Sequence, residues 1–197
     1  MSTLFVNACV RDGSRTEELA GFFLDRWKDE VREVNLQREN IQPLNGLTLT
    51  LRDRLVEERM EDHPLTRYAR DFARADTVVI AAPYWDLSFP SSLKVYLEAV
   101  SVCGVTFRYE NGVPKGLCRA ERLFYVTTSG GPVVRDFGYS YVRELAVSFY
   151  GIRRTERFCA EGLDMSGADV EGILAGAKGE IERWFERNRK EKGGAVV

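Results

Sequence analysis

Thr77-Val78-Val79-Ile80-Ala81-Ala82 is the stretch of this sequence that decides the fold. An unbroken run of apolar and β-branched residues, closed by Pro83, has the length and composition of a strand that is buried on both faces. Such strands occur in parallel sheets, because helices cover both faces of those sheets. We therefore expect residues 77–82 to lie at the centre of a parallel α/β sheet.

The segments on either side of this run alternate between strand and helix patterns. Strands are expected at 3–10, 31–36, 123–127 and 151–160, and apolar residues at helical spacing lie between and after them, at 19–27, 65–73, 93–103, 142–149 and from 170 onward. This alternation is typical of βαβ units, in which crossover helices cover an open sheet. It predicts one α/β domain over residues 1–197, with a doubly wound parallel five-stranded sheet in the order 2-1-3-4-5.

Two stretches depart from the alternation. Asn111-Gly112, between apolar runs, predicts a hairpin excursion around residues 105–118. Residues 37–64 are harder to interpret: Asn45-Gly46 indicates a turn, Leu47-Thr48-Leu49-Thr50-Leu51 alternates like a short edge strand, and Asp53–Glu61 resembles a charged helix.

Charge and composition exclude several classes of protein. Lys and Arg number 28 against 30 Asp and Glu, a net charge of -2 that lacks the basic footprint of a nucleic-acid partner. No apolar run approaches the roughly 18 residues that span a bilayer, and Arg11 and Asp12 interrupt the first run before a signal-peptide core can form. His63 is the only histidine, and the cysteines form no CxxC pair, so we expect no metal site. A cytoplasmic protein with no nucleic-acid or membrane partner is expected.

The order 2-1-3-4-5 places a crevice at the carboxyl ends of the first and third strands, where residues 10–16, 83–90 and 128–138 meet. In the first of these loops, Gly13, Ser14 and Thr16 directly precede a helix, so hydroxyls and free N–H groups converge on one anion site. Arg11 and Arg15 add positive charge if their side chains turn inward. The alternative is an ordinary helix cap beside two solvated arginines. Neither GxxxxGK[ST] nor GxGxxG is present, which disfavours ATP and a Rossmann-type NAD site.

The other two loops have the features of a site for a flat ring. Residues 82–90 expose aromatic side chains in a loop, where apolar bulk requires something to pack against. Capping of the sheet or a dimer seam is the alternative explanation. Thr127–Pro132 offers hydroxyls and two glycines, which let backbone amides approach a ligand closely, although a plain turn also uses such a pair. A phosphate in one loop and a flat heterocycle between the other two describe a mononucleotide such as FMN.

Several segments, spread over most of the chain, carry a family resemblance. They are Ala81–Leu87, Leu93-Lys94 with Tyr96, Gly104–Tyr109, Gly116-Leu117, Thr128–Gly131 and Ala160-Glu161-Gly162. In these segments the chain resembles the FMN-dependent NADH-quinone oxidoreductases and azoreductases of the flavodoxin-like NAD(P)H dehydrogenase superfamily. The resemblance implies a flavodoxin-like fold and is weakest between residues 37 and 64.

Roles for individual residues follow from the same resemblance. It implies a phosphate site at Ser14, Arg15 and Thr16, and a substrate cavity lined by Tyr109 and Phe149. It implies that the flavin ring and its pyrimidine edge are bound by Tyr84, Trp85, Asp86, Leu87, Thr128, Ser129, Gly130 and Gly131. The family usually has Asn in place of Asp86, and an acidic side chain there is expected to disfavour the anionic reduced flavin and lower its potential.

The resemblance also implies a mechanism and a quaternary structure. NADH or NADPH gives hydride to the flavin, leaves, and is replaced by a quinone or similar flat acceptor in a ping-pong cycle that needs no catalytic acid or base. A homodimer with flavin sites at its interface would bury the exposed Trp85, Phe89 and Phe107. Two rivals stay open: a flavodoxin-like carrier of single electrons to a protein partner, and a module that binds no flavin.

Overall fold

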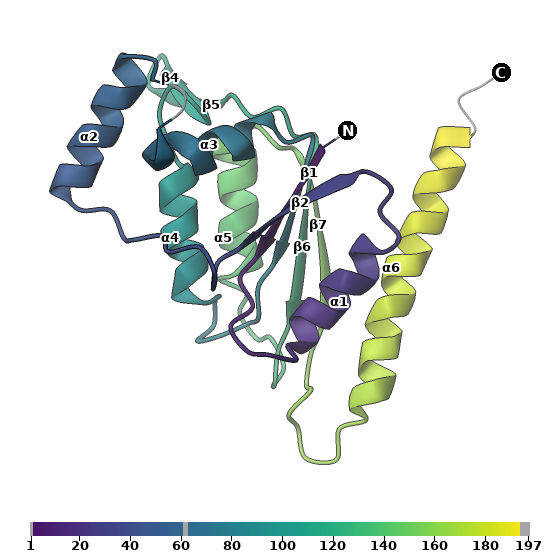
Figure 1. Ribbon diagram of the computed structural model, residues 1–197. Helices are drawn as coiled ribbons and strands as arrows, with labels where there is room; N and C mark the ends of the chain where they lie inside the picture. The colour runs from purple at the N-terminus through teal and green to yellow at the C-terminus, as the bar shows by residue number, and fades with distance from the viewer. Residues whose placement is uncertain (1, 61–62, 194–197) are drawn as a thin grey trace.

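The sheet has the predicted order. The computed structural model describes residues 2–60 and 63–193, and its main sheet is parallel, in the order β2-β1-β3-β6-β7 (Figure 1). Without the two hairpin strands, this order is the expected 2-1-3-4-5. The strands are β1 (Ser2–Asn7), β2 (Glu30–Asn35), β3 (Thr77–Ala81), β6 (Arg122–Thr128) and β7 (Arg154–Ala160).

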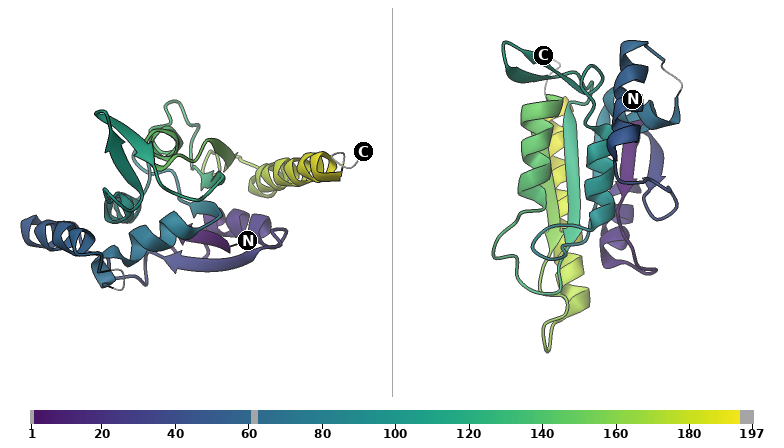
Figure 2. Two further views of the ribbon diagram at one scale, coloured as in Figure 1. Left: turned by 90° about the horizontal axis from the view of Figure 1, so that it is seen from above. Right: turned by 90° about the vertical axis from the view of Figure 1, so that its left-hand side faces the viewer.

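Helices cover both faces of this sheet. One face carries α1 and α6, and the other carries α3, α4 and α5, while α2 lies at the end of the molecule away from α6 (Figures 1 and 2). None of the described helices combines the length and apolar composition required to cross a membrane. The helices are α1 (Arg15–Leu24), α2 (Gly46–Glu57), α3 (Pro64–Arg74), α4 (Ser91–Val100), α5 (Tyr139–Glu144), the π-helical turn η1 (Leu145–Tyr150) and α6 (Val170–Gly193).

Strand β3 is buried over its whole length, as its composition predicts. Val78 and Ile80 point into the core beneath α3 and α4, whereas Val79 and Ala81 point into the core beneath α1 and α6. Successive side chains of a strand point to opposite faces, so a strand covered on both faces must be apolar at every position. The run at residues 77–82 therefore holds the two cores together.

The hairpin excursion is also confirmed. Strands β4 (Phe107–Glu110) and β5 (Val113–Gly116) pair antiparallel, and their connection places Asn111 at φ +53° and Gly112 at φ +79°. Positive φ at both central residues is the geometry that an Asn-Gly hairpin turn favours. At its far end, the hairpin packs so closely on η1 that a side chain at Gly116 has no room.

The expected edge strand at Leu47–Leu51 is wrong, because these residues form the first part of α2. Asn45, expected in a turn, caps this helix: its Oδ1 accepts hydrogen bonds from the N–H groups of Leu47 (3.0 Å) and Thr48 (3.1 Å). The Thr48 hydroxyl accepts one from the Asn45 N–H (2.9 Å), which completes a capping box. Leu47 is 85% exposed, so the leucine alternation reflects no buried strand face. The helix expected at Asp53–Glu61 is the second part of α2, and residues 61 and 62 lie outside the described residues.

Two Gly→Ala variants test the contact between the hairpin and η1. A Cβ at Gly116 would lie 2.2 Å from the Gly151 nitrogen, whereas a Cβ at Gly176 in α6 meets nothing within 4 Å. We expect Gly116→Ala to lower the free energy of unfolding by about 1–3 kcal/mol or more through overpacking. The control Gly176→Ala should raise it by about 0.5–1 kcal/mol, because alanine has the better helix propensity. Urea denaturation measures both, and equal stability of the two variants would contradict the close approach.

Candidate functional site

A pocket of about 420 Å³ lies at the carboxyl edge of the sheet, where the loops after β1, β3, β6 and β7 meet. It contains residues from all three loops that the sequence singled out. The predicted residues Asp86, Leu87, Gly131, Tyr109 and Phe149 lie outside its lining. Those that line it are Ser14, Arg15, Thr16, Tyr84, Trp85, Thr128, Ser129 and Gly130.

The loop after β1 presents a helix N-terminus to this pocket. Ser14 is the N-cap of α1, and its hydroxyl lies 3.4 Å from the Glu17 nitrogen. The first N–H groups of a helix have no partner within that helix, and their dipoles favour an anion. Thr16 is buried, and its hydroxyl lies 2.6 Å from the Thr128 hydroxyl, so one hydrogen bond joins the start of α1 to the end of β6.

Both arginines of this loop line the pocket. Arg15 donates from Nη1 to Asp164 Oδ1 at 2.7 Å, in an ion pair whose side chains are 41% and 69% exposed. The guanidinium of Arg11 lies 5.7 Å from the ring centre of Trp85. Exposed ion pairs contribute little to stability, so the pairing with Asp164 leaves Arg15 free to turn toward a bound anion.

The aromatic loop after β3 forms a tight turn at the rim of the pocket. Trp85 and Ser88 exchange backbone hydrogen bonds of 3.2 and 2.7 Å, and the residues between them, Asp86 and Leu87, have φ values of +51° and +66°. Leucine in this left-handed region costs of order 1–3 kcal/mol, and such conformations concentrate at functional sites. The turn directs Trp85 to the pocket lining and leaves Leu87 52% exposed.

The loop after β6 is fixed by its neighbours on both sides. The Tyr84 N–H donates to the Thr128 carbonyl oxygen (2.9 Å), and the Ser129 N–H donates to that of Ala160 (2.9 Å). A Cβ at Gly130 would lie 2.4 Å from Asp164 Oδ2, so glycine lets this loop approach the loop after β7 closely. The pocket therefore has a polar edge, formed by Thr128, Ser129 and Gly130 of this loop.

Sequence reasoning missed the fourth wall of the pocket. Leu163 and Asp164, from the loop after β7, belong to the lining. The rule that predicted the other three loops also applies here, because β7 is parallel to its neighbours and its carboxyl end lies at the same edge.

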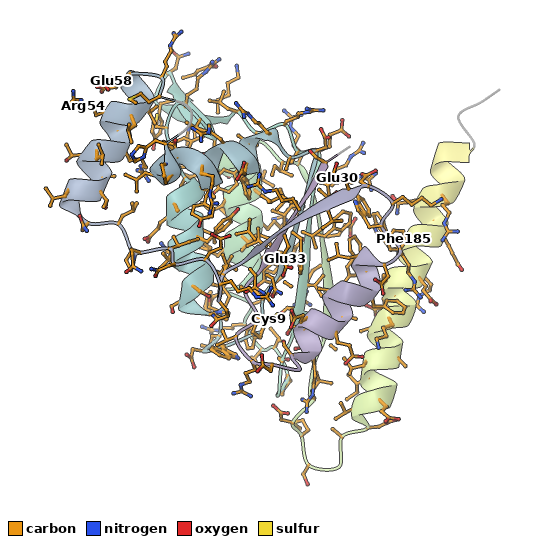
Figure 3. All side chains as sticks on the ribbon, viewed as in Figure 1. Cys9, Glu30, Glu33, Arg54, Glu58 and Phe185 are labelled. Atoms are coloured by element: carbon orange, nitrogen blue, oxygen red, sulfur yellow. The ribbon has the colours of Figure 1, made fainter. Side chains whose placement is uncertain are left out.

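A further residue, Asn7, lies at the end of β1 and is buried. Its Nδ2 donates to Glu17 of α1 (2.8 Å) and Glu33 of β2 (3.0 Å), and its Oδ1 accepts from the Cys9 N–H (3.0 Å). Figure 3 shows Cys9 and Glu33 in this region of the sheet. Burial raises the pKa of the Cys9 thiol to about 11, so this thiol stays neutral at pH 7. Asn7 thus joins three elements at the end of the strand that leads into the first loop.

The two residues expected in a substrate cavity lie together, near the hairpin. Phe149 and Tyr109 both contact Phe107, with ring centres 5.0 and 5.7 Å from it. The expectation that Phe107 is exposed is wrong: only 7% of it is accessible, and the ring of Phe149 from η1 packs against it. Tyr109 is 58% exposed, and Trp85 and Phe89 are half-buried.

Comparisons with known proteins agree with this architecture. A family model described as flavodoxin-like fold matches residues 1–185. FMN-dependent NADH:quinone oxidoreductase 2 of Clostridium acetobutylicum is 35% identical over 181 residues, which is 85% of this chain and 88% of that protein. FMN-dependent NADH:quinone oxidoreductase of Coprothermobacter proteolyticus is 31% identical over 193 residues, or 91% and 96% of the two chains.

A solved structure shows the same fold. The FMN-dependent NADH-azoreductase from Bacillus anthracis in complex with FMN superposes with a TM-score of 0.79 at 22% identity, over 94% of this chain and 98% of that one. Identity this low shows the fold alone, whereas the Clostridium relative and the Coprothermobacter relative are similar over 88% and 96% of their own lengths. This chain belongs to the flavodoxin-like family of FMN-dependent NADH:quinone oxidoreductases.

Proposed function

We propose that this protein is an oxidoreductase that binds FMN in the carboxyl-edge pocket and transfers electrons from NADH or NADPH to quinones or similar flat acceptors. One observation carries the proposal: a single pocket has a helix N-terminus at one side, Trp85 at another, and a polar edge from the loop after β6. A volume of about 420 Å³ lies within the range of roughly 300–1,000 Å³ typical of cofactor sites. The names of the two sequence relatives support the same cofactor and substrate class.

The residues present fit a phosphorylated ring system. Ser14 and Thr16 supply a hydroxyl and N–H groups at the start of α1, and Arg15 adds a guanidinium, a donor set suited to a phosphate. Tyr84 and Trp85 offer aromatic surface for a planar ring. Thr128, Ser129 and Gly130 bring hydroxyl and amide donors to its edge. Asp86, Leu87 and Gly131, outside the lining, are proposed to contact the ring from the rim.

Bound FMN supplies a ring that accepts hydride from a nicotinamide and gives electrons to a second substrate. The protein itself binds this ring, orients it and shields it from solvent. Because the donor must leave before the acceptor stacks on the same face, we propose a ping-pong cycle with no catalytic acid or base. The neutral Cys9 thiol, with its pKa raised by burial, takes no part.

We further propose that the protein works as a homodimer with its ring sites at the interface. Beside the pocket, Leu87 and Phe137 are 52% and 53% exposed, and the Phe137 N–H donates to the Leu87 carbonyl oxygen at 3.1 Å. On the hairpin, Tyr109 and Val113 are 58% and 64% exposed. Exposed apolar side chains beside a site, as at Leu87 and Phe137, are typical of an interaction surface, and the hairpin adds exposed apolar side chains at the other end of the sheet (Figure 1). A partner subunit there would place Tyr109 and Phe149 in the substrate cavity.

Anaerobic mixing with NADH tests the proposed activity. The protein reconstituted with FMN should lose its visible flavin absorbance within seconds of mixing, and a quinone added afterwards should restore it. Stopped-flow absorbance measures both steps, and parallel double-reciprocal plots would identify the ping-pong cycle. Flavin that NADH leaves oxidised would favour the single-electron carrier, whereas a protein that takes up no FMN would remove the cofactor proposal.

Ser14→Ala tests the phosphate site. Losing a hydrogen bond to a charged group costs roughly 1.5 kcal/mol, so the Kd for FMN should rise about tenfold. The Kd for riboflavin, which has no phosphate, should stay unchanged, as should that for FMN in the exposed control Ser140→Ala. Flavin fluorescence titration gives all these constants. Equal weakening for FMN and riboflavin would point to general loss of the loop structure instead of a phosphate contact.

The mass in solution tests the dimer. Light scattering during size-exclusion chromatography should give twice the 22.4 kDa of one chain. The mass of a single chain, with full NADH-dependent bleaching, would show that the site is complete without a partner.

A further inference from the structure

A second pocket, separate from the first, lies on the face of the sheet that carries α3 and α4. Its volume is about 470 Å³, and it shares no lining residue with the carboxyl-edge pocket. The loop after β2, α2, the first half of α3 and one residue of α4 form its walls. Much of its surface is apolar, including Ile41, Leu44 and Leu65. We call it the arginine pocket, because Arg52, Arg67 and Arg70 also line it.

Arg52 is the unusual member of the three. It is 8% exposed, and its Nη1 donates to the Glu98 carbonyl oxygen at 3.3 Å. Its buried Nε has no hydrogen-bond partner among the described residues. The nearest carboxylate, Asp53, lies 3.7 Å from Nε, beyond hydrogen-bond distance, and its side chain is 61% exposed. A buried cationic donor without a hydrogen-bond acceptor is costly, so a guanidinium that is paired this weakly is suited to an anionic group in the pocket.

The same helix shows that this burial is specific. Arg54, two residues further along, is 72% exposed and pairs with Glu58 at 2.7 Å. Figure 3 shows Arg54 and Glu58 at the outer end of α2, away from the sheet. The helix therefore exposes one guanidinium that is hydrogen-bonded to a carboxylate, and it buries another whose ion pair with the exposed Asp53 is too long for a hydrogen bond.

The other two arginines make the pocket positive. Arg67 is committed within the protein: its Nη2 donates to Glu39 and to the Tyr68 hydroxyl, both at 2.7 Å. Arg70 donates to the Thr66 hydroxyl at 3.0 Å, and no carboxylate in the described part of the chain pairs with it. Glu39 thus balances Arg67, whereas Arg52 has a long ion pair with the exposed Asp53, and Arg70 pairs with no carboxylate of the described residues.

We propose that the arginine pocket is a second ligand site, which binds an organic carboxylate with an apolar chain. The carboxylate binds beside the guanidinium of Arg52, with Arg70 adding positive charge, and the apolar chain of the ligand lies on Ile41, Leu44 and Leu65. A guanidinium suits the two oxygens of a carboxylate. The apolar wall favours such a ligand over inorganic phosphate, because phosphate has no apolar part that could be buried against that wall. The proposal is independent of the redox chemistry proposed above.

Isothermal titration of the FMN-saturated protein with decanoate tests this site. We expect one decanoate per chain, much weaker binding of uncharged 1-decanol, and a flavin spectrum that does not change. Inorganic phosphate at tenfold excess should not displace decanoate. Failure of decanoate to bind, equal binding of 1-decanol, or displacement by phosphate would each overturn the proposal. So would decanoate binding that disappears when FMN is added, since the ligand would then occupy the first pocket.

Variants locate the site. Arg52→Met keeps the apolar stem and removes the donor, and it should weaken decanoate binding at least tenfold. The matched control Arg54→Met, on the same helix, should leave the Kd unchanged. Should Arg52→Met fail to fold by circular dichroism, Arg70→Met gives the decisive measurement, with an expected several-fold loss. Wild-type affinity in a folded Arg52→Met or Arg70→Met variant would place the ligand elsewhere.

Discussion

The parallel pairing of β1 with β3 is the constraint on which the rest of this structure depends. The two strands run side by side in register, but the chain leaves them toward opposite faces, into α1 after β1 and into α4 after β3. Because these two helices lie on opposite faces of the sheet, neither of them covers the carboxyl ends of both strands. A gap therefore opens at their carboxyl ends, and the loops after four parallel strands meet around it.

Side-chain hydrogen bonds hold one end of that gap in place. The hydroxyl pair Thr16 and Thr128 joins α1 to β6, and Asn7 joins β1 to α1 and β2. The opposite rim is less constrained, because Asp86 and Leu87 project from a left-handed turn and Leu87 remains exposed. The pocket thus has one rigid end, suited to a charged group, and one open rim. This arrangement is consistent with a ligand that is held at the rigid end and with substrates that enter over the rim.

The two pockets attract negative charge in different ways. In the carboxyl-edge pocket, the side chains of Arg15 and Asp164 neutralise each other, so the helix N-terminus provides the fixed positive potential. In the arginine pocket, the potential comes from guanidinium groups, and the buried Nε of one of them has no acceptor among the described residues. The first arrangement places its donors at a single point, as a phosphate requires. The second combines charge with a broad apolar wall.

The sequence by itself determined the sheet order, the hairpin and three of the four loops around the crevice, because buried strands and their loops leave local patterns of composition. Residues 77–82 must be apolar on both faces, and Asn111-Gly112 favours one turn geometry, whatever surrounds them. Only the tertiary structure decided that Leu47–Leu51 is helical, that Phe107 is buried, and that Leu163 and Asp164 close the pocket. The burial of Phe107 and the position of Leu163 and Asp164 depend on residues that are distant in sequence. The helix at Leu47–Leu51 depends on the Asn45 cap, which an alternating pattern of leucines does not reveal. The burial of Arg52 belongs to the same class, since nothing next to it in the sequence distinguishes it from the solvated Arg54.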